Sequence, residues 1–296
     1  MTSVVGILNR KGIAIAADSA VTDNYLGSDS KIIKSGNKML RLCNDAPIAV
    51  MITDWGVFNG TPWDLIIRAY RRERRPTPKH VKDAMEDLFT FIEEHNSFCE
   101  EDDKSYQVYA SGHSELVFTG YGIEDLQPSL FSADVTITSN GRLSWLQGEE
   151  VHIDDSCPVA ICPFAQQDQI NALKYGIEEK YLANLVDNIF KDISMLLRSD
   201  RESLRDKLSE AICSKKQAYE QHWSKAVEHY NLAQMASLAE NLIHVTELYK
   251  KVQFQPENVG GLIDLALITR EDGFTWLNRK SWYNPSRGGQ YGKFGV

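Results

Sequence analysis

The sequence predicts an α+β fold arranged as a four-layer αββα sandwich, in which two β-sheets pack face to face and helices cover both outer sides. Three observations predict it. Short apolar strands open the chain and return in its middle, and two amphipathic helices separate these strand regions. A long helical stretch and a closing strand pair then complete the order. A chain of 296 residues is long enough to bury a substantial core.

The first strands begin at the N-terminus. Ser3 to Leu8 and Gly12 to Ala17 are short apolar runs, and the turn residues between them predict a hairpin. After a polar loop, two further strands are expected over Lys38 to Cys43 and Pro47 to Ile52. Lys38 therefore opens the third strand of the chain.

Helices and further strands follow in turn. Apolar residues recur at spacings of three and four over Trp55 to Arg74 and over Pro78 to Phe98, which predicts two amphipathic helices. Between about Tyr106 and Ile161 the pattern is again that of short strands separated by turn residues. From Phe164 to Gln253 the periodicity is helical almost throughout.

A strand pair closes the chain. Leu262 to Thr269 and Phe274 to Leu277 flank an acidic turn that ends in glycine, which predicts a hairpin. We expect a single domain over residues 1–282, with a helical extension over about 176–236. The glycine-rich residues 283–296 lack periodicity and are expected to form a flexible tail.

The composition argues against several classes of function. The formal net charge of −9 argues against a nucleic-acid binder, which needs a basic face to neutralise phosphates. No apolar run reaches about 18 residues, and no charged start precedes an apolar stretch. We therefore expect neither a membrane span nor a secretory signal, and a cytoplasmic location.

The metal-binding residue types are scattered. The five cysteines fit neither a disulfide framework nor a zinc site, and we expect free thiols. His222 and His229 lie seven residues apart without a carboxylate or cysteine at a ligand spacing. The sequence thus predicts no metal site and no cofactor.

Thr2 is the first candidate for chemistry. A threonine hydroxyl is a weak nucleophile that needs a neighbouring base, and one known base is the chain's own amino terminus. Removal of Met1, which is usual before a small residue, gives Thr2 both a hydroxyl and a free α-amine. The pKa of an α-amine is about 7.7–8.0, so part of it is neutral at cellular pH and can accept the hydroxyl proton.

The residues that follow Thr2 resemble a known family. Asp18 ends the second predicted strand, and Lys38 lies in Gly36-Asn37-Lys38-Met39-Leu40. With Thr2 they resemble the N-terminal nucleophile (Ntn) hydrolases, specifically the β-type proteasome subunits and the bacterial HslV peptidase. The resemblance is clearest in the N-terminal quarter of the chain, and Val259 to Thr269 is similar to the family's late glycine pair and strand.

The resemblance implies a role for each residue. Thr2 would be the nucleophile, and Lys38, held by Asp18, would ease formation of an alkoxide. The lysine charge would also keep the neighbouring α-amine neutral by like-charge repulsion. By the same resemblance, the backbone N–H of Val50 is expected to bind the oxyanion of the tetrahedral intermediate.

The resemblance also implies how a peptide binds. In this family the substrate adds as a strand between the segment after the aspartate and the segment after the oxyanion donor. These positions predict substrate contacts from Val21, Thr22, Ile48 and Ile52. The apolar side chains of Val21, Ile48 and Ile52 predict cleavage after a hydrophobic residue.

The chain departs from the family pattern at supporting positions. The family's serine at the start of the long helix pair has no counterpart in Ile161-Cys162-Pro163-Phe164. Its serine before the glycine pair is replaced by Val259, and the preceding aspartate falls on Pro256, beside Glu257. Since these groups orient the amine and relay protons, their loss favours an altered or absent activity.

Three functions therefore stay open. The first is a threonine-type peptidase that acts on peptides or unfolded proteins within a homo-oligomeric ring, with an ATP-dependent unfoldase as a partner. The second is a catalytically silent, proteasome-like structural or assembly protein. The third is an Ntn amidase that acts on small molecules in a closed cavity.

Overall fold

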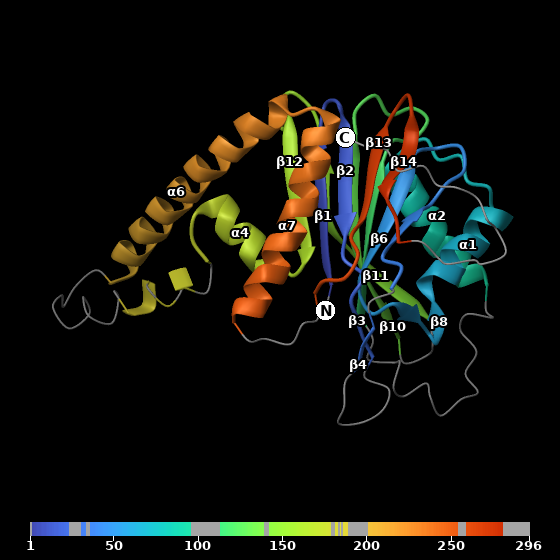
Figure 1. Cartoon of the computed structure of the whole chain (residues 1–296), viewed down its shortest axis with the longest axis horizontal. Coiled ribbons are helices and arrows are strands. Elements are labelled where there is room, and N and C mark those ends of the chain that lie inside the picture. Colours follow the sequence, from blue (N-terminus) through green and yellow to red (C-terminus); the bar gives the residue numbers. More distant parts are fainter. Residues whose placement is uncertain are drawn as a thin grey trace.

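Antiparallel sheets with helices beside them make up the chain in a computed structural model (Figure 1). The structure describes residues 2–23, 31–33, 36–95, 113–138, 142–178, 181–182, 184, 186–188, 201–253 and 259–280. This combination of helices and antiparallel sheets agrees with the predicted α+β class. Met1 and the predicted tail over residues 283–296 lie outside the described residues.

The first sheet is built around the N-terminal hairpin, with the strand order β12-β1-β2-β13-β14. Its strands are β1 (Ser3–Asn9), β2 (Gly12–Ala17), β12 (Val159–Ala165), β13 (Asp264–Thr269) and β14 (Gly273–Asn278). β1 and β2 are buried along their whole length because each has a strand on both sides and apolar residues against both faces. The predicted N-terminal and closing hairpins are confirmed.

The second sheet has the strand order β11-β10-β9-β6-β5. Its strands are β5 (Met39–Arg41), β6 (Ile48–Asp54), β9 (His113–Gly120), β10 (Ser129–Ile137) and β11 (Leu143–His152). Two small hairpins lie apart from the large sheets: β3 (Val21–Asp23) with β4 (Lys31–Ile33), and β7 (Val57–Phe58) with β8 (Thr61–Pro62). β3 and β4 occupy part of the predicted polar loop, which is a correction to the sequence prediction.

The helices include α1 (Trp63–Glu73), α2 (Val81–Glu94), α4 (Asp168–Tyr175), α6 (Arg201–His229) and α7 (Leu232–Val252). α1 begins eight residues later than predicted, since the β7–β8 hairpin takes up the start of the predicted helix. Phe164 was predicted to open the long helical stretch. It belongs instead to β12, which is a strand because it pairs with β1.

Three clusters of buried hydrophobic residues hold these elements together. One draws side chains from both large sheets, including Val4 and Ile13 from the first and Met51 and Val117 from the second. A second lies where α1 and α2 pack on the second sheet, and a third lies where α7 packs on β1 and β2. The N-terminal strands thus have buried side chains on both faces of their sheet.

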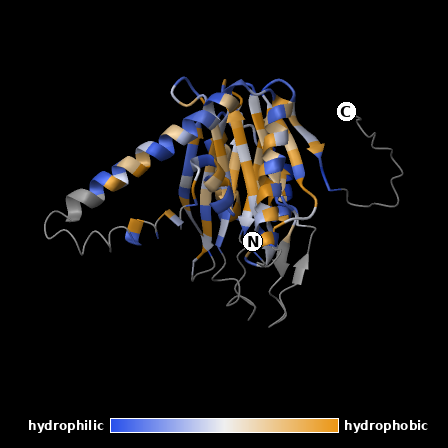
Figure 2. Cartoon of the chain, turned by 60° about the vertical axis from the view of Figure 1, so that its left-hand side comes forward, coloured by the Kyte–Doolittle hydropathy of each residue, from blue (hydrophilic) through white to orange (hydrophobic). Residues whose placement is uncertain are grey.

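α6 extends away from the sheets and meets them only near its C-terminal end (Figures 1 and 2). There the turn between β1 and β2 caps it, because Asn9 donates to the carbonyl of Val227 and Lys11 donates to that of His229. A lysine at this end also complements the helix dipole. Among the described residues, no helix combines the length and apolar character of a membrane span.

Replacement of Gly120 by alanine is expected to destabilise the fold by about 1–3 kcal/mol. Gly120 has a φ of +151°, and a Cβ there would lie 2.2 Å from the carbonyl oxygen of Pro47, which is backbone and cannot rotate away. Gly56 is the matched control, because a Cβ at Gly56 meets nothing within 4 Å. Urea unfolding should separate the two variants, and equal stability would contradict the prediction.

Candidate active site

Thr2 is held at the start of β1, an inner strand of the first sheet. Thr2 is 4% exposed, and its carbonyl oxygen accepts a hydrogen bond from the backbone N–H of Gln166 at 3.2 Å. The next residue, Ser3, pairs with Ala165 of β12. The first residue that the structure describes is therefore fixed against the end of β12, a segment far away in the sequence.

Asp18 directly follows β2 and is fully buried. Its carboxylate accepts backbone N–H groups from Ser3 at 2.9 Å, Ala20 at 3.2 Å and Gly260 at 3.0 Å. Hydrogen bonds from donors favour the charged form of a buried carboxylate. The surrounding backbone therefore offers this buried carboxylate three N–H donors.

Lys38 supplies the matching cation. Its side chain is 6% exposed, and its Nζ lies 2.6 Å from Oδ1 of Asp18. Burial lowers the pKa of Lys38 below that of free lysine, the contact with Asp18 opposes this effect, and the charge of Lys280 adds to the lowering. The site therefore holds a buried ammonium that is easier to deprotonate than an exposed one.

One carboxylate oxygen of Asp18 connects the Lys38 side chain to the backbone beside Thr2. Oδ1 of Asp18 accepts both the Nζ of Lys38 and the backbone N–H of Ser3. The Ser3 N–H belongs to the peptide bond that joins Thr2 to Ser3. The structure thus brings the Lys38 ammonium to within one peptide unit of Thr2.

A second buried ion pair lies beside the first. Lys280 follows β14, and its Nζ lies 3.1 Å from Oδ2 of Asp264, the first residue of β13. Both side chains are less than one-tenth exposed. This pair was not predicted from the sequence, although Asp264 lies between the apolar residues Ile263 and Leu265, a pattern that can indicate a buried charge.

Val50 does not occupy the position predicted for an oxyanion donor. It lies in the middle of β6 and pairs with Leu40 on one side and Phe118 on the other. The Ile52 N–H donates to the Lys38 carbonyl, so Lys38 and Ile52 form a hydrogen-bonded pair. Such pairs recur at every second residue of an antiparallel ladder, so Leu40 and Val50 form the next one, and the Val50 N–H donates to the Leu40 carbonyl. It is not free to bind a substrate.

The predicted substrate-binding residues separate into two groups. Ile48 and Ile52 are buried in the cluster that joins the second sheet to α1 and α2, so the structure does not place them in a pocket. Their side chains fall on the same face as that of Val50 because the three alternate along one strand. Val21 and Thr22 lie in β3, close after Asp18, and the described residues include their backbone alone.

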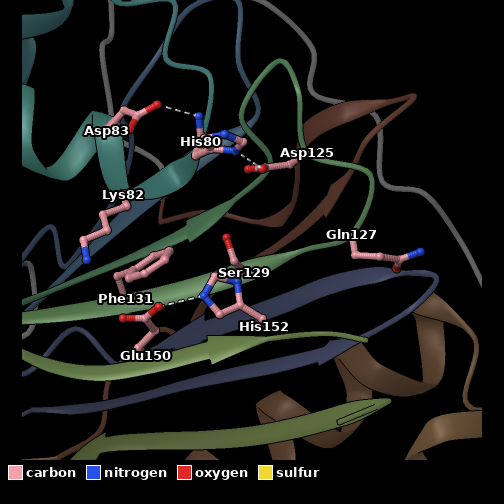
Figure 3. Close-up of a pocket in the computed structure, with 9 residues that line it drawn as sticks. All are labelled: His80, Lys82, Asp83, Asp125, Gln127, Ser129, Phe131, Glu150 and His152. Carbon is pink, nitrogen blue, oxygen red and sulfur yellow. Dashed lines mark hydrogen bonds and ion pairs between the residues drawn. The ribbon is translucent and has the colours of Figure 1, made fainter. Parts of the chain in front are cut away.

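A pocket on the second sheet offers a different set of polar residues (Figure 3). Its histidines are already paired: Nδ1 of His80 lies 2.6 Å from Asp125, and Nε2 of His152 lies 2.8 Å from Glu150. The hydrogen bond that His80 makes to the Asp125 carboxylate is the main cause that raises the pKa of His80. Among the described residues, no cluster of His, Cys, Asp and Glu could hold a metal ion. Ser129 also lines the pocket, but among the described residues the hydrogen bonds of the two histidines go to Asp125 and Glu150 and not to its hydroxyl, so the Thr2 site is the stronger candidate.

Comparison with known proteins gives likenesses of fold only. No family model matches the chain, and no curated protein matches its sequence. One similar solved structure is the Gly-1 mutant of Anbu from Hyphomicrobium sp. strain MC1, with 15% identity and a TM-score of 0.47, over 94% of this chain and 86% of that one. Another is Anbu, an ancestral beta-subunit, from Yersinia bercovieri, with 10% identity and a TM-score of 0.46, over 94% and 88%.

Proposed function

We propose that this chain is an amide hydrolase whose nucleophile is the hydroxyl of Thr2 and whose base is the α-amine of the same residue after removal of Met1. One observation carries the proposal. Oδ1 of Asp18 accepts hydrogen bonds from the buried Lys38 ammonium and from the N–H of the Thr2–Ser3 peptide bond. Taking two charges out of water costs free energy that their pairing often does not fully offset. A purely structural role does not need that cost at the start of a strand.

The proposed reaction proceeds through an ester. The Thr2 oxygen attacks the carbonyl carbon of the substrate while the α-amine accepts the hydroxyl proton. The tetrahedral intermediate then expels the amine product, which takes a proton from the α-ammonium, and an ester to Thr2 remains. Water attacks this ester, the α-amine accepts a proton from the water, and the acid product leaves as Thr2 regains its hydroxyl.

Lys38 contributes electrostatics to this scheme. Its positive charge lowers the energy of the forming alkoxide and disfavours protonation of the nearby α-amine. Asp18 keeps the ammonium in place and balances its charge. The scheme needs no histidine, in agreement with a site whose buried charged residues are Lys38, Asp18, Lys280 and Asp264.

A peptide is the substrate that we propose. Strand β3 (Val21–Asp23) begins three residues after Asp18, so a substrate strand aligned with it would present its carbonyl near Thr2. The proposed setting is a β-type subunit of αββα architecture, assembled as a homo-oligomeric ring in the cytoplasm, with cleavage after hydrophobic residues and an unfoldase as a partner. The oxyanion donor is a group other than the Val50 N–H.

A catalytically silent homologue is the second candidate, and the placement of Val50 favours it. Val50, the residue expected to be the oxyanion donor, has no free N–H because it lies in the β5–β6 ladder. Loss of such a donor costs about 10²–10³-fold in rate. In this alternative the buried Lys38–Asp18 pair would only support the fold.

The intact mass before and after treatment with a peptide epoxyketone tests the proposal, because this warhead needs the hydroxyl and the free α-amine of one N-terminal residue. We expect a mass that lacks Met1 and gains one adduct, mapped to Thr2. Prior alkylation of the cysteines, of which Cys213 is exposed, prevents a false adduct on sulfur. A processed Thr2 that stays unmodified would support the silent homologue instead.

A further inference from the structure

Lys280 contacts the segment that carries Lys38. Its ammonium donates to the carbonyl oxygen of Gly36, two residues before Lys38, and pairs with Oδ2 of Asp264. Its backbone N–H also donates to Oδ1 of Asp264 at 2.9 Å. One buried lysine therefore connects the end of the closing strand pair to the approach to β5.

The opposite side of Gly36 is also fixed. Its N–H donates to the carbonyl oxygen of Ser19 at 3.1 Å, and the Ser19 N–H donates to the carbonyl of Gly260 at 3.2 Å. Gly260 in turn donates to the carboxylate of Asp18. The Gly36 peptide groups are thus held between the Asp18 segment and Lys280, so that Lys38 has little freedom to move away from Asp18.

We propose that Lys280 is a positioning residue for Lys38, and that it acts by holding the Gly36 backbone against the start of β13 through Asp264. This inference rests on the proposed function, since it assigns Lys280 to the hydrolytic site. Lys280 does not contact the reacting atoms. It fixes the backbone from which the Lys38 ammonium reaches Asp18.

A charge effect accompanies the positional one. Among the residues that the structure describes, the charged groups that face Lys38 are Asp18 and Lys280, with the Thr2 α-amine added after Met1 removal. Burial is the main cause that lowers the pKa of Lys38, and the like charge of Lys280 lowers it further. Loss of the Lys280 charge should therefore raise the pKa of Lys38.

The test compares Lys280→Met and Lys280→Arg by two readouts. The first is the titration of Lys38, followed by NMR of lysine labelled with ¹³C at the ε-carbon and assigned through Lys38→Arg. The second is the rate of epoxyketone adduct formation against pH. We expect Lys280→Met to move the Lys38 titration to higher pH and to slow adduct formation by about ten- to a hundredfold, as a displacement of about 1 Å can do. Lys280→Arg should retain most of both properties.

Two further variants make the result decisive. Lys79→Met removes an exposed lysine that pairs with Glu124 and should change neither readout. The double variant Asp264→Asn with Lys280→Met leaves no unpaired buried ion, so it is the version to use if the single variant does not fold. It should show the same upward shift of the Lys38 titration.

The outcomes separate this inference from the proposed function. An unchanged Lys38 titration and an unchanged rate in a folded Lys280→Met protein would overturn the positioning role. If wild-type protein forms no adduct, the proposed hydrolase activity fails. The NMR titration would still decide whether Lys280 controls the state of Lys38.

Discussion

Alanine at position 2 is expected to abolish the epoxyketone adduct, with a loss in rate of at least about 10³-fold, as for other enzymes that lose their nucleophile. Thr2→Ala keeps a free α-amine but removes the hydroxyl, so it tests the nucleophile alone. Ala is small enough for Met1 removal to proceed as before. The measurement is the rate at which intact protein gains the mass of the inhibitor.

Thr2→Ser is the matched control for this loss. Serine retains both the hydroxyl and the α-amine, so we expect adduct formation to persist at a reduced rate. Thr2 is buried, and the loss of its methyl group should alter packing only modestly. An adduct of undiminished rate on Thr2→Ala would show that another residue reacts, and would remove the main support for the proposed mechanism.

Substitution of Asp18 is expected to have the largest effect on stability. Asp18→Ala leaves the Lys38 ammonium buried without its partner, and removal of one member of a buried pair costs about 3–5 kcal/mol. It also removes the acceptor for the backbone N–H groups of Ser3, Ala20 and Gly260. Urea unfolding at constant pH measures the loss, and adduct formation should disappear with it.

A double-mutant cycle separates the charge pair from the backbone hydrogen bonds. Asp18→Asn with Lys38→Met removes both charges, so it should be more stable than the sum of the two single variants predicts. Lys251→Met, which breaks an exposed pair with Glu247, should cost no more than about 1 kcal/mol. A cost for Asp18→Ala as small as that of the Lys251 variant would contradict a buried, tightly held pair.

The part of the site that sequence patterns could predict is the part set by local structure. β1 and β2 are apolar runs joined by a turn, so Asp18 could be placed at the end of a strand before the structure was known. Thr2 and Lys38 lie next to such strands. The strand and turn pattern placed each residue locally, and the family resemblance supplied the expectation that the three act together.

The remainder depends on pairing between distant segments, which such patterns do not report. Whether the Val50 N–H is free depends on which strands flank β6, and β6 lies between β5 and β9 in the second sheet. Phe164 lies in a strand because β12 pairs with β1, against a helical pattern that follows it. Lys280 lies 242 positions after Lys38 in the sequence (280 − 38), and nothing local indicates their proximity.

The contacts around Asp18 have a consequence for the order of events during synthesis. The carboxylate is bound by Ser3 from the first strand and by Gly260 from the far end of the chain. A ribosome releases the N-terminal residues long before residue 260 is made, and contacts between such distant segments form late in folding. Removal of Met1 can therefore precede completion of the Asp18 environment. In the proposed mechanism, a newly exposed threonine would therefore remain inert during translation, and the growing chain would be protected from premature cleavage.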